Sequence, residues 1–74
     1  MEEINYKEID RRKIIEYISK RGGQCLVDEI IKNSGANKLR VYPILFEESQ
    51  THNITVIEEE NLGSPKVVKL SHYE

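Results

Sequence analysis

The sequence predicts an α+β fold that is mostly helical, with three helices followed by a two-stranded antiparallel hairpin. Apolar residues recur at helical spacing up to about residue 50, and after Asn53 they alternate along two short segments. These two segments are separated by NLGSP, a run of turn-forming residues around one leucine. A chain of 74 residues is enough for one small domain, which we expect to span 1–74.

The first helix is expected over 7–21. Its apolar positions follow the i, i+3, i+4 spacing of one buried stripe, with charged residues on the other sides. The stripe consists of Ile14, Ile15 and Ile18, with Tyr17 beside it. Gly22 and Gly23 follow directly and are expected to end the helix, because glycine adopts the left-handed conformation that commonly closes helices.

A short extended segment, 24–26, is expected before the second helix. That helix should begin at Val27 or Asp28. Ile30 and Ile31 are expected to face the interior of the domain. Three consecutive turn formers then predict its end: Asn33, Ser34 and Gly35.

The third helix is expected to be capped by Asn37, whose side chain can accept a hydrogen bond from a free backbone N–H. Pro43 leaves two starting points open. A helix that begins at Lys38 would kink near 39–43, because proline cannot donate to the carbonyl of residue 39. Alternatively, 38–41 form a turn and the helix begins at Pro43, a position that proline tolerates well.

The hairpin is expected to have a loop over 61–65. If Glu60 lies opposite Lys66, the same register places Val56 opposite Leu70. One face of the hairpin then carries only apolar residues, and that face should cover the core. Its members are Ile54, Val56, Val68 and Leu70.

This order of elements resembles the winged helix-turn-helix family over 10–71. The segments that carry the resemblance are GGQC, VDEIIKNSG, NKLRVYPIL and ITVIEEENLGSPKVVKL. Gly35 and Val41 also have the six-residue spacing between turn glycine and β-branched core residue that such motifs favour. The resemblance implies that the third helix enters the major groove of DNA and that the hairpin loop lies on the DNA backbone or in the minor groove.

The function implied by the resemblance is a small DNA-binding transcriptional regulator whose partner is double-stranded DNA. Arginine can pair with guanine and asparagine with adenine, whereas lysine suits a phosphate. The residues expected to contact DNA are Asn37, Lys38, Arg40, Tyr42, Ser64 and Lys66. The net charge is −2, so any DNA binding must depend on a local basic patch.

The alternative function is a winged helix that binds a protein partner or forms a homodimer through an apolar belt over 41–46. Six consecutive apolar residues, VYPILF, surround the helix, so Val41 and Leu45 can face the core while Tyr42 and Phe46 cannot. Leu62 at the hairpin loop adds an exposed apolar residue. Glutamates next to these residues disfavour a phosphate backbone; they are Glu47, Glu48, Glu58, Glu59 and Glu60.

Other functions have little support in the sequence. Nucleotide-binding, hydrolase and zinc-protease motifs are absent, so we expect no enzyme, no cofactor and no metal site. Cys25 is expected to be a small buried residue, and His52 and His72 lie too far apart in sequence to suggest a metal site. The longest apolar run is 41–46 and the N-terminus has no secretory signal, so we expect a cytoplasmic protein without membrane contact.

Overall fold

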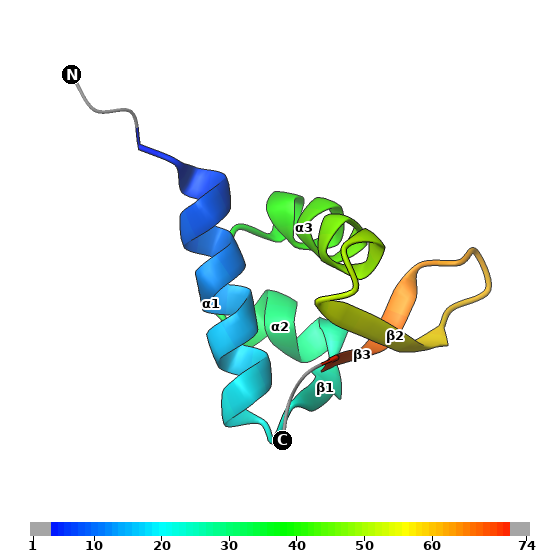
Figure 1. Ribbon diagram of the computed structural model, residues 1–74. Helices are drawn as coiled ribbons and strands as arrows, with labels where there is room; N and C mark the ends of the chain where they lie inside the picture. The colour runs from blue at the N-terminus through cyan, green and yellow to red at the C-terminus, as the bar shows by residue number, and fades with distance from the viewer. Residues whose placement is uncertain (1–3, 72–74) are drawn as a thin grey trace.

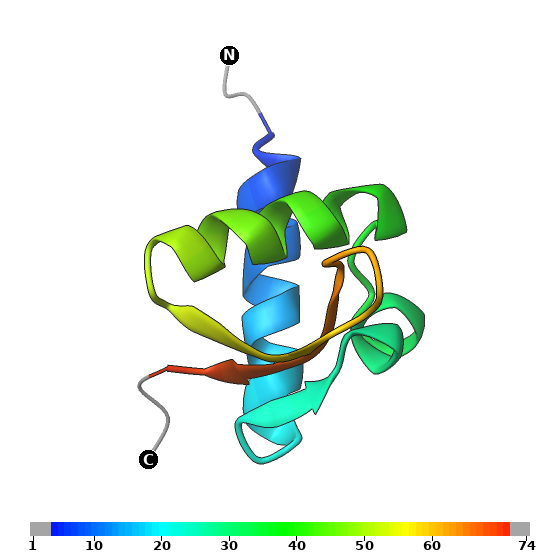
Figure 2. The same ribbon diagram turned by 90° about the vertical axis from the view of Figure 1, so that its right-hand side faces the viewer.

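The computed structural model describes residues 4–71, which form three helices and a three-stranded antiparallel sheet (Figure 1). The α+β class expected from the sequence is therefore confirmed. The elements, in order, are α1 (Tyr6–Lys20), β1 (Gln24–Leu26), α2 (Val27–Asn33), α3 (Lys38–Gln50), β2 (Ile54–Glu59) and β3 (Pro65–Leu70). Viewed from the side of the hairpin, α3 lies across α1, and the hairpin and α2 lie on the same side of α1 (Figure 2).

Helix α1 begins and ends one residue earlier than the sequence predicted. Asn5 caps its start, because the Asn5 side chain accepts a hydrogen bond from the Glu8 N–H at 3.0 Å. At its end the Gly23 N–H donates to the Ile18 carbonyl at 2.9 Å, which is the six-to-one hydrogen bond of a Schellman motif. Gly22 supplies the left-handed residue that this motif requires, with φ of 86°.

Helix α3 begins at Lys38, so the first of the two expected starting points is correct. The Asn37 side chain accepts a hydrogen bond from the Leu39 N–H at 2.9 Å, as expected for a cap. The turn before it is closed by Gly35, which has φ of 84°. Pro43 lies within the helix on its exposed side. Proline has no N–H to donate to the Leu39 carbonyl, and on the exposed side water can take the place of this donor at little cost.

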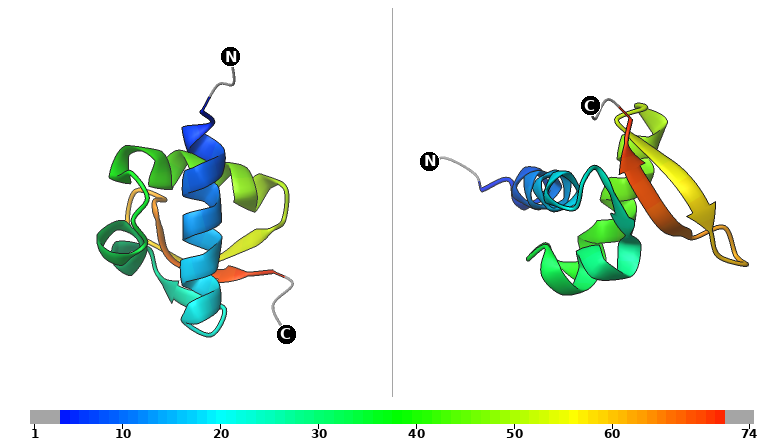
Figure 3. Two further views of the ribbon diagram at one scale, coloured as in Figure 1. Left: turned by 90° about the vertical axis from the view of Figure 1, so that its left-hand side faces the viewer. Right: turned by 90° about the horizontal axis from the view of Figure 1, so that it is seen from below.

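The core lies between the three helices and one face of the sheet. The expected inward positions are confirmed except Ile15, which is only partly buried and lies outside the core cluster. Tyr17, Ile31, Val56 and Leu70 pack against the core from its edges. Eleven residues form the buried cluster: Ile14, Ile18, Cys25, Val27, Ile30, Ala36, Val41, Ile44, Leu45, Ile54 and Val68. The two further views show α1 on one side of this core and the sheet on the other (Figure 3).

The sheet contains one strand more than predicted, because β1 pairs with β3 and places Cys25 opposite Val68. The expected hairpin register was wrong by two residues. Val56 lies opposite Val68, and the loop occupies 60–64, where the Glu60 N–H donates to the Ser64 carbonyl at 2.8 Å. A shift of two residues leaves each side chain on its original face, so the expected apolar face is nevertheless correct.

We call residues 60–64 the hairpin tip.

Within the described residues, none of the helices combines the length and the apolar character needed to cross a membrane.

Candidate functional site

The side of α3 that faces away from the core is largely apolar. One side of α3 is buried and consists of Val41, Ile44, Leu45 and Glu48. Helical spacing places four other residues on the opposite side: Leu39, Pro43, Phe46 and Gln50. We call these four residues the outer face of α3. Leu39 is 78% exposed and Phe46 is 65% exposed, so two large apolar side chains of this face project into solvent.

Tyr42 lies on the edge of the outer face that is nearer the hairpin. The sequence placed Tyr42 and Phe46 outside the core, and both are exposed. Leu39 was not recognised in the sequence as an exposed apolar residue, although its spacing of four and seven residues from Pro43 and Phe46 was available as a signal. Leu62 at the hairpin tip is 96% exposed, so it does not fold back onto the hairpin.

Arg40 lies on the edge of the outer face that borders α1. Its guanidinium Nη1 lies 3.0 Å from the Asp10 carboxylate, and it stacks over the Tyr6 ring at 5.4 Å from the ring centre. Asp10 is only 5% exposed, so this ion pair links α1 to α3 at the border of the core. The arginine that the resemblance assigned to base reading therefore already has two partners within the domain.

Asp10 was not recognised in the sequence as a residue of structural importance. It precedes Ile14 by four residues and Ile18 by eight, which places it on the same buried stripe of α1. This spacing was the signal that could have identified it.

Glu47 and Glu48 differ in their surroundings. Glu47 pairs with Lys7 of α1 and remains half exposed. Glu48 is buried, and its Oε2 accepts a hydrogen bond from Asn53 Nδ2 at 2.7 Å, while Arg11 Nε lies 3.7 Å from its Oε1. Of the two α3 glutamates expected to disfavour phosphate, only Glu47 presents its charge at the surface.

Most basic side chains of α1 are also engaged by carboxylates. Arg11 and Arg12 both contact Glu8, and the hydrogen bond from Arg11 lowers the pKa of Glu8, while burial acts in the opposite direction. Six of the eleven basic residues form ion pairs: Lys7, Arg11, Arg12, Arg21, Lys32 and Arg40. In residues 4–71, Lys38 and Lys66 have no carboxylate within ion-pair distance.

A groove lies between α3, the start of α2 and the tip end of the hairpin. Six residues line it: Leu26, Val27, Asp28, Tyr42, Glu60 and Lys66. It therefore brings together Tyr42 and Lys66, two of the residues expected to contact DNA. Lys38 precedes Tyr42 by four residues and lies on the same side of α3.

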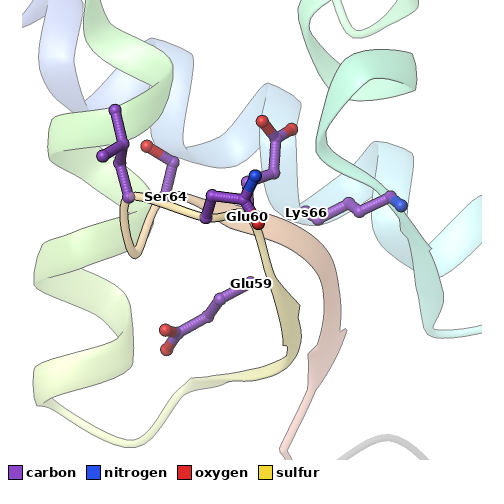
Figure 4. A pocket seen from close by; sticks show the side chains of 6 residues that line it. Glu59, Glu60, Ser64 and Lys66 are labelled. Carbon is purple, nitrogen blue, oxygen red and sulfur yellow. The ribbon is translucent and has the colours of Figure 1, made fainter.

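The hairpin tip forms a second concave surface, and its side chains point in different directions. Figure 4 shows Lys66 pointing toward β1 and α2, and Glu59 pointing away to the other side of the tip. Ser64 is exposed, but its carbonyl closes the tip by accepting from the Glu60 N–H. Glu59, Glu60 and Asn61 line the same hollow as Ser64 and Lys66. Lys66 is therefore surrounded by acidic and neutral residues, and the hollow is not a continuous basic surface.

The remaining candidates for reactive chemistry are not brought together. Burial raises the pKa of Cys25 to about 11, and the nearby Glu29 carboxylate adds to this effect, which Arg21 partly opposes. His52 is exposed in the turn after α3, and His72 lies outside the described residues. No group of three or more His, Cys, Asp or Glu within 4–71 is arranged to hold a metal ion.

Comparisons with known proteins found no match to this chain among family models, curated proteins or solved structures.

Proposed function

We propose that this chain is a winged-helix domain that binds another protein chain through the outer face of α3. The order of three helices and a hairpin, with β1 added to the sheet beside β3, supports the winged-helix assignment. The observation that carries the functional proposal is the exposure of Leu39 and Phe46 on the same side of one helix, about two turns apart. In a DNA-binding winged helix, this helix would present polar side chains to the base edges.

The energetic argument concerns apolar area. Removing a leucine or phenylalanine side chain from water contributes about 1.5–3 kcal/mol, so a partner that covers Leu39 and Phe46 gains substantial binding free energy. The domain itself gains little from these residues, because most of each side chain is exposed and the core lies on the other side of α3. Recognition of a helix face by its apolar side chains is a common mode of protein binding.

The charges around this face are consistent with a protein partner. Arg40 forms an ion pair with Asp10, and Glu58, Glu59 and Glu60 are exposed along the hairpin. A phosphate backbone would meet these carboxylates without the basic surface that usually supplies most of the affinity for DNA.

The test is site-specific photo-crosslinking in the cell of origin, with benzoylphenylalanine at Phe46. The matched control places the same group at Lys20, which is exposed at the other end of α1. We expect a defined protein adduct from position 46, lost when Leu39→Asp is added, and no such adduct from position 20. Equal labelling at both positions would remove the proposal.

Double-stranded DNA is a second candidate partner, favoured by one observation. Lys38 and Lys66 have no carboxylate partner in the described part of the chain, and both lie on the side of α3 where Tyr42 lines the groove. Together with Asn37 and Ser64, they could contact two or three phosphates.

Fluorescence anisotropy with mixed-sequence duplex DNA at about 50 and 200 mM salt tests this second candidate, because phosphate contacts weaken with salt. Binding that falls between these concentrations and is lost in Lys38→Glu, but kept in Lys20→Glu, would favour DNA. Absence of binding at the lower concentration would remove it.

A further inference from the structure

The edge of the outer face that borders α1 carries two opposite charges two helical turns apart. Arg40 and Glu47 both lie on this edge, because Arg40 contacts Asp10 and Glu47 contacts Lys7, and both partners belong to α1. Their side chains are 40% and 51% exposed, so each can still reach a group outside the domain. The positive charge lies near the start of α3 and the negative charge lies toward its end.

The outer face itself has the spacing of a short coiled-coil seam. Leu39, Pro43, Phe46 and Gln50 follow one another at intervals of four, three and four residues, which are the a and d positions of a heptad. Arg40 and Glu47 then occupy successive e positions. When two helices with such seams run antiparallel, the e position of one lies beside the e position of the other, so charges on this edge decide orientation.

We infer that the occupant of the outer face is a second copy of this chain, with its α3 packed antiparallel to the first. This inference rests on the proposed function. Arg40 of each copy then lies beside Glu47 of the other, so the seam carries two complementary charge pairs. A parallel arrangement pairs e with g positions instead, where Tyr42 and Ser49 offer no opposite charge.

The antiparallel register also gives the one polar residue of the seam a hydrogen-bond partner. It places Pro43 against Phe46 of the second copy and Gln50 against Leu39. Because Pro43 has no N–H, the Leu39 carbonyl lacks its usual helical donor, and the Gln50 side-chain amide of the second copy can donate to it.

The size of the surface predicts a weak dimer. The described chain has 5444 Å² of accessible surface, and a stable interface usually covers about 800 Å² on each partner. The outer face with its charged edge consists of six side chains, whereas a stable interface usually involves about 20–30 residues on each partner. We therefore expect association in the micromolar range.

Sedimentation velocity of the purified chain, from about 5 to 500 µM, is the first measurement. We expect the mass to rise from that of one chain, 8.6 kDa, toward twice that value. Phe46→Glu should remain monomeric throughout, and its circular dichroism should match that of the unchanged protein. A monomer at every concentration for the unchanged protein would overturn the inference.

Charge reversal tests the edge contacts. Glu47→Arg places a second positive charge beside Arg40 of the other copy and should weaken the dimer about tenfold or more. Glu59→Arg makes the same change of charge on the hairpin and should leave the dissociation constant within about twofold. Equal weakening by both variants would show a general charge effect and would contradict the proposed contact.

Disulfide formation tests the orientation. In a Cys25→Ser background, the Leu39→Cys chain and the Gln50→Cys chain are oxidised separately and as a mixture. The antiparallel register predicts a linked dimer only in the mixture, whereas a parallel pair would link each variant to itself. If the protein is monomeric but position 46 still crosslinks to a different protein in cells, the inferred homodimer is wrong and the proposed function stands. If the protein is monomeric and position 46 gives no protein adduct, both the homodimer and the proposed function are wrong.

Discussion

Arg40 and Asp10 form an ion pair between α3 and α1, with Nη1 of Arg40 at 3.0 Å from Oδ2 of Asp10. The two partners are unequally buried. Asp10 is 5% exposed, whereas the Arg40 side chain lies at the surface and stacks on Tyr6. A residue that the family resemblance assigned to DNA thus contributes to the packing of two helices, and its substitution would change DNA binding and stability together.

Removing Arg40 should destabilise the domain more than removing Asp10. Arg40→Ala leaves a buried carboxylate without its partner, and we expect a loss of about 2 kcal/mol in the free energy of unfolding. Asp10→Ala leaves a guanidinium that can reach water, and we expect a loss of about 1 kcal/mol. Urea denaturation of both variants and of the double variant checks this, and the double variant should lose less than the sum.

Phe46 and Leu45 are neighbours in sequence, but Leu45 is buried in the core and Phe46 is 65% exposed. Leu45→Ala should lower the free energy of unfolding by about 2–5 kcal/mol, because it leaves a cavity in the core. Phe46→Ala should change it by less than about 0.5 kcal/mol when the protein is dilute and monomeric. Thermal unfolding followed by circular dichroism compares the two variants. A large fall in the free energy of unfolding of Phe46→Ala would mean that the outer face stabilises the domain itself.

Periodicity predicted most of the fold correctly. Helical spacing identified Ile14, Ile18 and Leu45 as core residues, and the alternation after Asn53 identified the buried face of the hairpin. These predictions succeed because burial repeats with the geometry of each element. The register failed because a five-residue tip was placed one residue too late along the chain, which changes the pairing by two residues. The pairing of β1 was missed because three residues carry too little pattern.

The outer face could be predicted only in part. The apolar run over 41–46 implied that Tyr42 and Phe46 lie outside the core, and this is confirmed. The sequence could not show that Arg40 turns toward α1, because its partner Asp10 lies thirty residues earlier. Long-range ion pairs depend on how two helices pack, and no local spacing encodes them.

His52 adopts a left-handed backbone conformation, with φ of 63°, at the end of α3. It closes a Schellman motif in which the Asn53 N–H donates to the Glu48 carbonyl at 2.9 Å. His52→Gly should therefore raise the free energy of unfolding by about 0.5–1 kcal/mol, because glycine adopts this conformation without strain.

Gly22→Ala makes the reverse change at the end of α1. The added methyl group has space, but alanine is strained in the left-handed conformation, so the free energy of unfolding should fall by about 1 kcal/mol.

Cys25 should be protected from thiol reagents by the fold. Its pKa is raised from 9.0 to about 11, chiefly by burial, so near pH 8 the reactive thiolate should be about a hundredfold less populated than in the unfolded chain. Labelling with iodoacetamide in water and in concentrated urea measures this difference. Rapid labelling of the native protein would show that Cys25 is reached without unfolding.

The same shift makes stability depend on alkaline pH. Between pH 9 and 11 the unfolded chain has lost the Cys25 proton while the folded chain keeps it, so the free energy of unfolding falls as pH rises. At pH 10 the loss attributable to Cys25 should be about 1 kcal/mol. Urea denaturation at pH 8 and pH 10 gives the slope, and Cys25→Ala is the control, because lysines and tyrosines titrate in both proteins. The slope should be shallower in Cys25→Ala by that amount, and equal slopes would mean that the thiol is not buried.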